Sequence, residues 1–126
     1  MEQTKKKMND NANSIYLVVN LDYLITLSKG NTEFVKEMIG IFIEENPEEM
    51  QLLEKGIQEK DFALIFSSAH KLKSAMPFVG LDKIIEKEIS EMEKLASEKS
   101  DILKIKLLFS KVKINCEKAC QELKQL

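Results

Sequence analysis

Residues 67–80 read Ser-Ser-Ala-His-Lys-Leu-Lys-Ser-Ala-Met-Pro-Phe-Val-Gly and carry His70, the only histidine in the chain. At about 100° per residue, a helix over residues 61–76 would place six apolar side chains on one stripe. They are Phe62, Ile65, Phe66, Ala69, Leu72 and Met76. His70 falls on the flank of this stripe, so the sequence predicts an imidazole between the core and the solvent side of a helix.

The neighbours of His70 on this helix include small and positively charged residues. Ser67 and Ser74 lie one turn before and one turn after it, and they leave one side of the imidazole accessible. Lys73 lies one turn on and Lys71 is adjacent, so two ammonium groups can reach an anion held by the ring. The pattern therefore indicates a site for an anionic group such as phosphoryl.

The residues after the histidine predict where its helix ends. Pro77 has no N–H and would clash with the carbonyl of Lys73, so we expect a kink or a stop about two turns past His70. Gly80 then supplies a positive φ or a close backbone approach before the next helix begins at 81 or 82.

The motif Ala69-His70-Lys71-Leu72-Lys73, the small residue at 74 and Gly80 resemble the signature of histidine-containing phosphotransfer (HPt) domains. The resemblance extends over residues 20–126 and implies a histidine that exchanges a phosphoryl group with the aspartate of a response-regulator receiver domain, alone or within a hybrid histidine kinase. By position, the resemblance implies that His70 is the phosphoacceptor, that Lys71 and Lys73 support the phosphate, and that Gly80 permits close backbone packing. Helical spacing adds Phe66, Ser67 and Ser74 as the residues that surround the site. Docking would use apolar surface that includes Phe66 and a short helix over 21–28.

Two positions depart from the family pattern. Ser74 stands where the family usually has glycine, although serine is also small. The family often has a glutamine on the next helix that hydrogen-bonds the imidazole; the corresponding region here offers Met92, with Glu88, Ser90 and Glu91 nearby. The sequence therefore does not identify the residue that orients the imidazole ring of His70.

The composition favours one all-α domain. The 126 residues are 44% hydrophobic and 32% charged, with two prolines, four glycines and no run of strand-like alternation. A net charge of −2 does not fit a nucleic-acid-binding protein. No apolar run approaches the ~20 residues of a membrane span, and the N-terminus lacks a secretory pattern. We expect a cytoplasmic monomer that binds neither membrane nor nucleic acid.

The remaining pattern completes an antiparallel four-helix bundle with a short additional N-terminal helix. We expect residues 1–13 to be a disordered lead, residues 14–126 to form the domain, and the apolar run 15–19 to cover one end of it. The expected helices are 21–28 capped by Asn20, 32–59 capped by Asn31 or Thr32 and bent at Pro47, 61–76 capped by Asp61, 81–96, and 102–126. Two helices meeting at Pro47 are the alternative to one bent helix.

The final segment has the clearest periodicity. Apolar residues recur at steps of three and four, as in a helix of an antiparallel bundle. They are Ile102, Ile105, Phe109, Val112, Cys116, Ala119, Leu123 and Leu126. The two cysteines lie four apart on this face, which disfavours a disulfide, and with one histidine in the chain we expect core residues and no metal site.

The sequence does not predict an enzyme in its own right. It has no Gly-rich phosphate cradle for a kinase, and Ser67 or Ser74 lacks the orienting acid that a hydrolase requires. We expect no cofactor of its own, because the receiver would supply the acidic pocket and its Mg²⁺. The alternative is a structural adaptor bundle, in which replacing His70 would leave partner binding and signalling intact.

Overall fold

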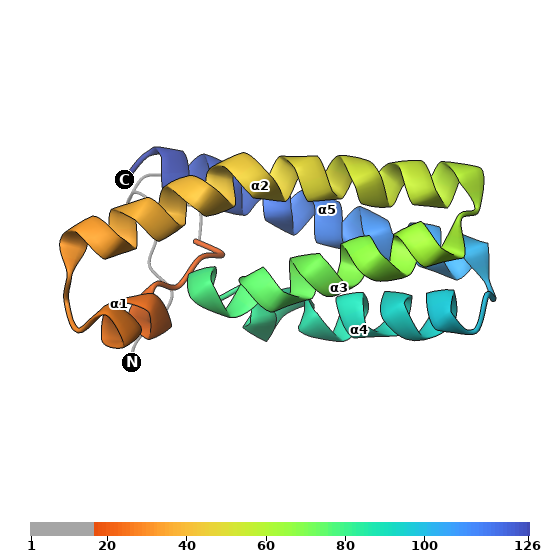
Figure 1. The fold of residues 1–126 in the computed structure, drawn as a ribbon, viewed down its shortest axis with the longest axis horizontal. Helices are drawn as coiled ribbons and strands as arrows, with labels where there is room; N and C mark the ends of the chain where they lie inside the picture. Colours follow the sequence, from red (N-terminus) through yellow and green to blue (C-terminus); the bar gives the residue numbers. More distant parts are fainter. Residues whose placement is uncertain (1–16) are drawn as a thin grey trace, which may run out of the picture.

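The computed structural model describes residues 17–126, and within this range the chain forms five helices and no strand. The helices are α1 (Asp22–Ser28), α2 (Thr32–Glu59), α3 (Phe62–Val79), α4 (Asp82–Ser97) and α5 (Ile102–Lys124). Figure 1 shows α2 to α5 as an antiparallel bundle with α1 at one end. The predicted all-α four-helix bundle with a short additional helix is confirmed. The predicted disorder of residues 1–13 lies outside the described residues.

Each long helix packs against two others. α2 contacts α3 and α5, and α4 contacts the same two helices, so α3 and α5 lie diagonally opposite each other. The predicted stripe of α5 faces the core, where Ile105, Val112, Cys116 and Ala119 are fully buried. The stripe ends earlier than predicted, because the helix stops at Lys124 and Leu126 is exposed.

The predicted caps Asn31 and Asp61 are found at the starts of α2 and α3, whereas the N-cap of α1 is Leu21 and not the predicted Asn20. The side chains of Asn31 and Asp61 accept hydrogen bonds from the N–H of Phe34 and Leu64, both at 3.1 Å. α1 begins at Asp22, one residue later than predicted, and Asn20 accepts from the Asp22 N–H at 2.9 Å. α2 continues through Pro47 as one helix, as Figure 1 shows, so the single-helix prediction is confirmed.

Pro77 does not end α3, which runs on to Val79 and is capped by Gly80. The stop predicted about two turns past His70 therefore falls at Val79, two residues beyond the proline. Proline removes one helical donor, to the carbonyl of Lys73, and only two helical residues follow it. So close to the helix end, the loss of one bond is not enough to terminate the helix.

Gly80 has both a positive φ and a close approach to another backbone segment, which the sequence analysis gave as alternatives. Its φ is +78°, and a Cβ built on it would lie 2.7 Å from the backbone oxygen of Asn20. The approach is held by the Asn20 N–H, which donates to the carbonyl of Val79 at 2.8 Å. Gly80 therefore fixes the segment that leads into α1 against the end of α3.

We predict that Gly80→Ala lowers the free energy of unfolding by about 2 kcal/mol or more, because alanine meets both a left-handed φ and a backbone clash. Urea unfolding followed by circular dichroism measures this change. The matched control is Gly40→Ala within α2, where an added Cβ meets no atom within 4 Å. That variant should stabilise the fold by roughly 0.5–1 kcal/mol. Similar effects at both glycines would contradict the prediction.

The described part of the apolar run 15–19 covers the C-terminal end of α5. The N–H groups of Val18 and Val19 donate to the carboxylate of Glu122 at 2.9 and 3.0 Å, and the Val19 side chain is buried. This part of the prediction is confirmed, and Ile15 and Tyr16 lie outside the described residues. Among residues 17–126, no helix has the length and apolar content that crossing a bilayer requires.

Candidate functional site

His70 projects from the outer side of α3 and is the exposed centre of the predicted site. Its side chain is 66% exposed. The hydroxyl groups of Ser67 and Ser74 donate to the carbonyls of Leu64 and Lys71 on the same helix, at 3.2 and 2.8 Å. Both serines are thus turned back to their own backbone, and the imidazole stays accessible from solvent.

Phe66 covers one side of the imidazole. The two rings are nearly parallel, at an interplanar angle of 6°, with centroids 6.0 Å apart. Phe66 is itself 40% exposed, which is unusual for a large apolar side chain. The two side chains therefore present one continuous surface on α3, formed by the phenyl ring of Phe66 and the imidazole of His70.

A carboxylate on α4 fixes the orientation of the ring. Nδ1 of His70 lies 2.7 Å from Oε2 of Glu93, and the ammonium of Lys73 donates to the other carboxylate oxygen, Oε1, at 2.8 Å. An ionised carboxylate only accepts hydrogen bonds, so Nδ1 carries a proton. In the neutral ring, the lone pair is consequently on Nε2.

Glu93 is buried, yet it remains an anion at neutral pH. Burial by itself would raise the pKa of this carboxyl group, but the hydrogen bonds from Lys73 and His70 outweigh it and hold the pKa below the ordinary value. A lowered pKa in the folded state stabilises the protein above the unfolded pKa. This stabilisation is lost as the pH falls through the folded value.

Glu93 was missing from the sequence prediction, which pointed to Met92 and its neighbours. Met92 is fully buried in the core. Glu88 pairs with Lys111 at 2.7 Å and Glu91 with Lys104 at 3.5 Å, so both carboxylates turn toward α5. The corrected orienting residue is Glu93.

One signal in the sequence could have identified Glu93. It lies four residues after Ile89 and three before Ala96, on the buried stripe of α4. A carboxylate on an apolar stripe is costly unless it is paired. Such a residue therefore predicts a cationic or hydrogen-bond-donating partner on the facing helix.

The two predicted lysines lie on opposite flanks of His70, and each is held by a neighbouring helix. Lys73 pairs with Glu93 on the α4 side. Lys71 pairs with Glu49 of α2 at 3.0 Å, and this hydrogen bond raises the pKa of the lysine. The ammonium of Lys71 sits on a 65% exposed side chain, so it can move to a new anion at small cost.

Apolar surface continues from His70 toward α1. A hollow of about 190 Å³ between α2 and α3 opens beside Lys71, and it is mainly apolar. Its apolar lining includes Met38, Ile41 and Phe42 from α2 and Ala75 and Phe78 from α3. Tyr23 of α1 packs on Phe78 with ring centroids 6.1 Å apart, and Ile25 and Leu27 are about half exposed. Gly80 lies at this end of α3, about 15 Å along the helix from His70.

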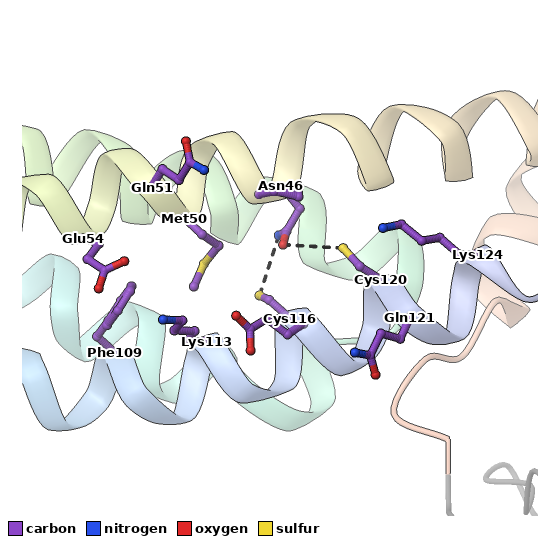
Figure 2. A pocket seen from close by; sticks show the side chains of 12 residues that line it. Asn46, Met50, Gln51, Glu54, Phe109, Lys113, Cys116, Cys120, Gln121 and Lys124 are labelled. Atoms are coloured by element: carbon purple, nitrogen blue, oxygen red, sulfur yellow. Dashed lines mark hydrogen bonds between the residues drawn. The ribbon is translucent and has the colours of Figure 1, made fainter.

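Another cavity lies away from His70, between α2 and α5. It has a volume of about 590 Å³, and Figure 2 shows the amide of Asn46 between the thiols of Cys116 and Cys120. The nitrogen and oxygen of this amide lie 3.6 and 3.9 Å from the two sulfur atoms. Burial raises the pKa of Cys116 to about 12, so its thiol is protonated and unreactive. Both cysteines are buried free thiols, as predicted for core residues.

Comparison with known proteins places these features in context. Residues 37–103, just over half of the chain, match the family model described as the Hpt domain. The fold is similar to the crystal structure of the HPT domain from the Hpt sensor hybrid histidine kinase from Shewanella, with a TM-score of 0.66 and 20% sequence identity. That match covers 86% of this chain and 96% of the other. No curated protein matches in sequence. The matched segment contains both His70 and Glu93.

Proposed function

The chain belongs to the Hpt domain family of two-component phosphotransfer modules, and on this premise we propose that His70 relays a phosphoryl group to and from a receiver aspartate. The resemblance noted in the sequence is thereby confirmed, and the proposal concerns the step that His70 performs. The partner would be a response-regulator receiver domain, alone or within a hybrid histidine kinase.

The hydrogen bond between Nδ1 of His70 and Glu93 carries this proposal. It leaves Nε2 as the nucleophile, on a ring that projects to solvent from a rigid helix. In the forward step, Nε2 attacks the phosphorus atom of the aspartyl phosphate, the P–N bond forms and the P–O bond to the aspartate breaks. The aspartate leaves as a carboxylate, and the step is reversible.

Glu93 also supports the product of transfer. With phosphorus on Nε2 and the proton retained on Nδ1, the imidazole ring carries a positive charge. The carboxylate 2.7 Å away offsets this charge. The receiver would supply Mg²⁺ and the acidic pocket, so this chain needs no cofactor of its own.

The two lysines have different proposed roles. Lys71 exchanges Glu49 for the phosphoryl oxygens, since its side chain is 65% exposed and its ion pair with Glu49 lies at the surface. Lys73 is bound to Glu93 and is only one-third exposed, so it acts mainly by holding that carboxylate in place. We propose that the receiver docks on α1, on the hollow between α2 and α3 and on Phe66, and that this chain acts as a monomeric cytoplasmic protein.

Phosphotransfer from a panel of receiver domains tests this function. Each receiver is first charged with radiolabelled phosphate and then incubated with this protein. We expect at least one receiver to transfer label, and the label to be acid-labile and base-stable, as phosphohistidine is. If no receiver transfers label while circular dichroism shows the intact helical fold, the relay is wrong and the adaptor function is favoured.

A further inference from the structure

The outer face of α5 carries an apolar stripe that the bundle does not use. Leu103, Leu107 and Ile114 are 69%, 74% and 64% exposed, and no other large apolar side chain within a described helix is as exposed. Their spacing of four and seven residues places them on one face, opposite the buried residues of the same helix. We call these three residues the α5 outer stripe.

Lysines flank this stripe on both sides. α5 contains six lysines and two glutamates. Glu122 is buried against the backbone of residues 18 and 19, and Glu117 is exposed on the same face as the stripe, beyond Ile114. Lys104 and Lys111 pair with Glu91 and Glu88 of α4. The flanking residues Lys106, Lys113 and Lys118 make no ion pair within residues 17–126.

We propose that the α5 outer stripe binds an acidic amphipathic helix of another protein. Such a helix would cover the stripe with its apolar side chains and place carboxylates against the flanking lysines. The stripe spans roughly 17 Å, or about three helical turns, which suits one helix lying alongside α5.

The charges around the α5 outer stripe argue against three other binding partners for it: a second copy of this chain, its own N-terminal segment and a membrane. A second copy that packs α5 on α5 would oppose lysine with lysine. The N-terminal segment of this chain carries Lys5, Lys6 and Lys7, so it would be repelled as well. An anionic membrane is disfavoured because the whole protein has a net charge of −2 and the stripe offers only three large exposed apolar side chains for insertion.

The position of α5 makes this interaction compatible with phosphotransfer. α5 lies diagonally opposite α3, with α2 and α4 between them. A helix bound to the α5 outer stripe therefore leaves His70 and its surroundings free. The inference goes beyond the relay and holds whether or not His70 is phosphorylated.

The test uses a synthetic capped peptide with leucines on one helical face and glutamates on both flanks. Amide chemical shifts locate its binding site, and fluorescence anisotropy measures its affinity. We expect shifts on α5, and at least about tenfold weaker binding to Leu107→Ser/Ile114→Ser and to Lys106→Glu/Lys113→Glu. The matched controls Leu52→Ser and Lys87→Glu, both at exposed positions on other helices, should bind as the wild type does, and so should His70→Gln.

Several outcomes would overturn the proposal. One is absence of binding, and another is equal binding of a peptide whose glutamates are replaced by lysines. A third is chemical shifts confined to other helices. Self-association in sedimentation that is lost in Leu107→Ser/Ile114→Ser would assign the stripe to a second copy. Binding to anionic phospholipid vesicles, without binding to the acidic peptide, would assign it to a membrane.

Discussion

Replacing His70 with glutamine should reduce label transfer from a charged receiver by about a thousandfold or more. Glutamine keeps a polar side chain that can donate to Glu93, but its amide is not a nucleophile. The chain has no other histidine that could accept the phosphoryl group. Because the His70 side chain is 66% exposed, the variant should keep the stability of the wild type. A single-turnover transfer assay, read on a gel, measures the loss.

A second histidine placed elsewhere provides the matched control. Gln58 is exposed on α2, so Gln58→His in the His70→Gln background restores an accessible imidazole without Phe66 or Glu93 beside it. We expect this double variant to stay inactive, because the site requires an oriented nitrogen as well as an exposed one. Full labelling of His70→Gln would show that the phosphoryl group resides elsewhere. Recovery in the double variant would show that the surroundings of His70 contribute little.

The sequence predicted the fold well because the bundle depends on local periodicity. The stripe of α5 and the caps Asn31 and Asp61 are encoded within a few residues of the features they determine. The stop predicted near Pro77 falls two residues later, because the loss of one hydrogen bond so close to the helix end does not terminate α3. Gly80 needed the structure for a different reason. Its neighbour Asn20 lies sixty residues earlier in the chain, so no local pattern reveals the contact.

The site was predictable only along its own helix. His70, the two serines and the lysines lie within two turns of α3, and their spacing alone brings them together. Glu93 and Glu49 come from α4 and α2, so their contacts depend on the register between helices. Apolar stripes predict which faces of two helices pack together. They do not determine the axial register between the helices, which can shift by one helical turn without changing the faces in contact. The ionic partners of the lysines therefore emerged only from the structure.

Replacing Glu93 with methionine should slow phosphotransfer by about 10- to 100-fold, the cost usually found when a metal-ligating histidine loses the carboxylate that orients it. Methionine has a similar length but cannot accept the proton of Nδ1. The ring then samples both tautomers, and the phosphorylated ring loses its counter-charge. Glu93→Gln separates the two effects, because it removes the charge and keeps one oxygen that can accept from Nδ1–H, with the amide NH₂ group then facing Lys73. We expect its rate to lie between those of the wild type and Glu93→Met.

A purely structural role for Glu93 would give a different pattern of results. Both variants would lower the free energy of unfolding relative to the wild type, and this difference would shrink as the pH falls through the lowered pKa of Glu93. Neither the transfer rate nor the ¹⁵N spectrum of the ring would change. For a positioning role, the spectrum should show the Nδ1–H tautomer in the wild type and in Glu93→Gln, and a mixture in Glu93→Met.

Lys73→Met is the control, since it removes the other partner of the carboxylate but keeps the bond to His70. If Lys73→Met lost more of the transfer rate than Glu93→Met, the main electrostatic role would belong to Lys73 and not to Glu93.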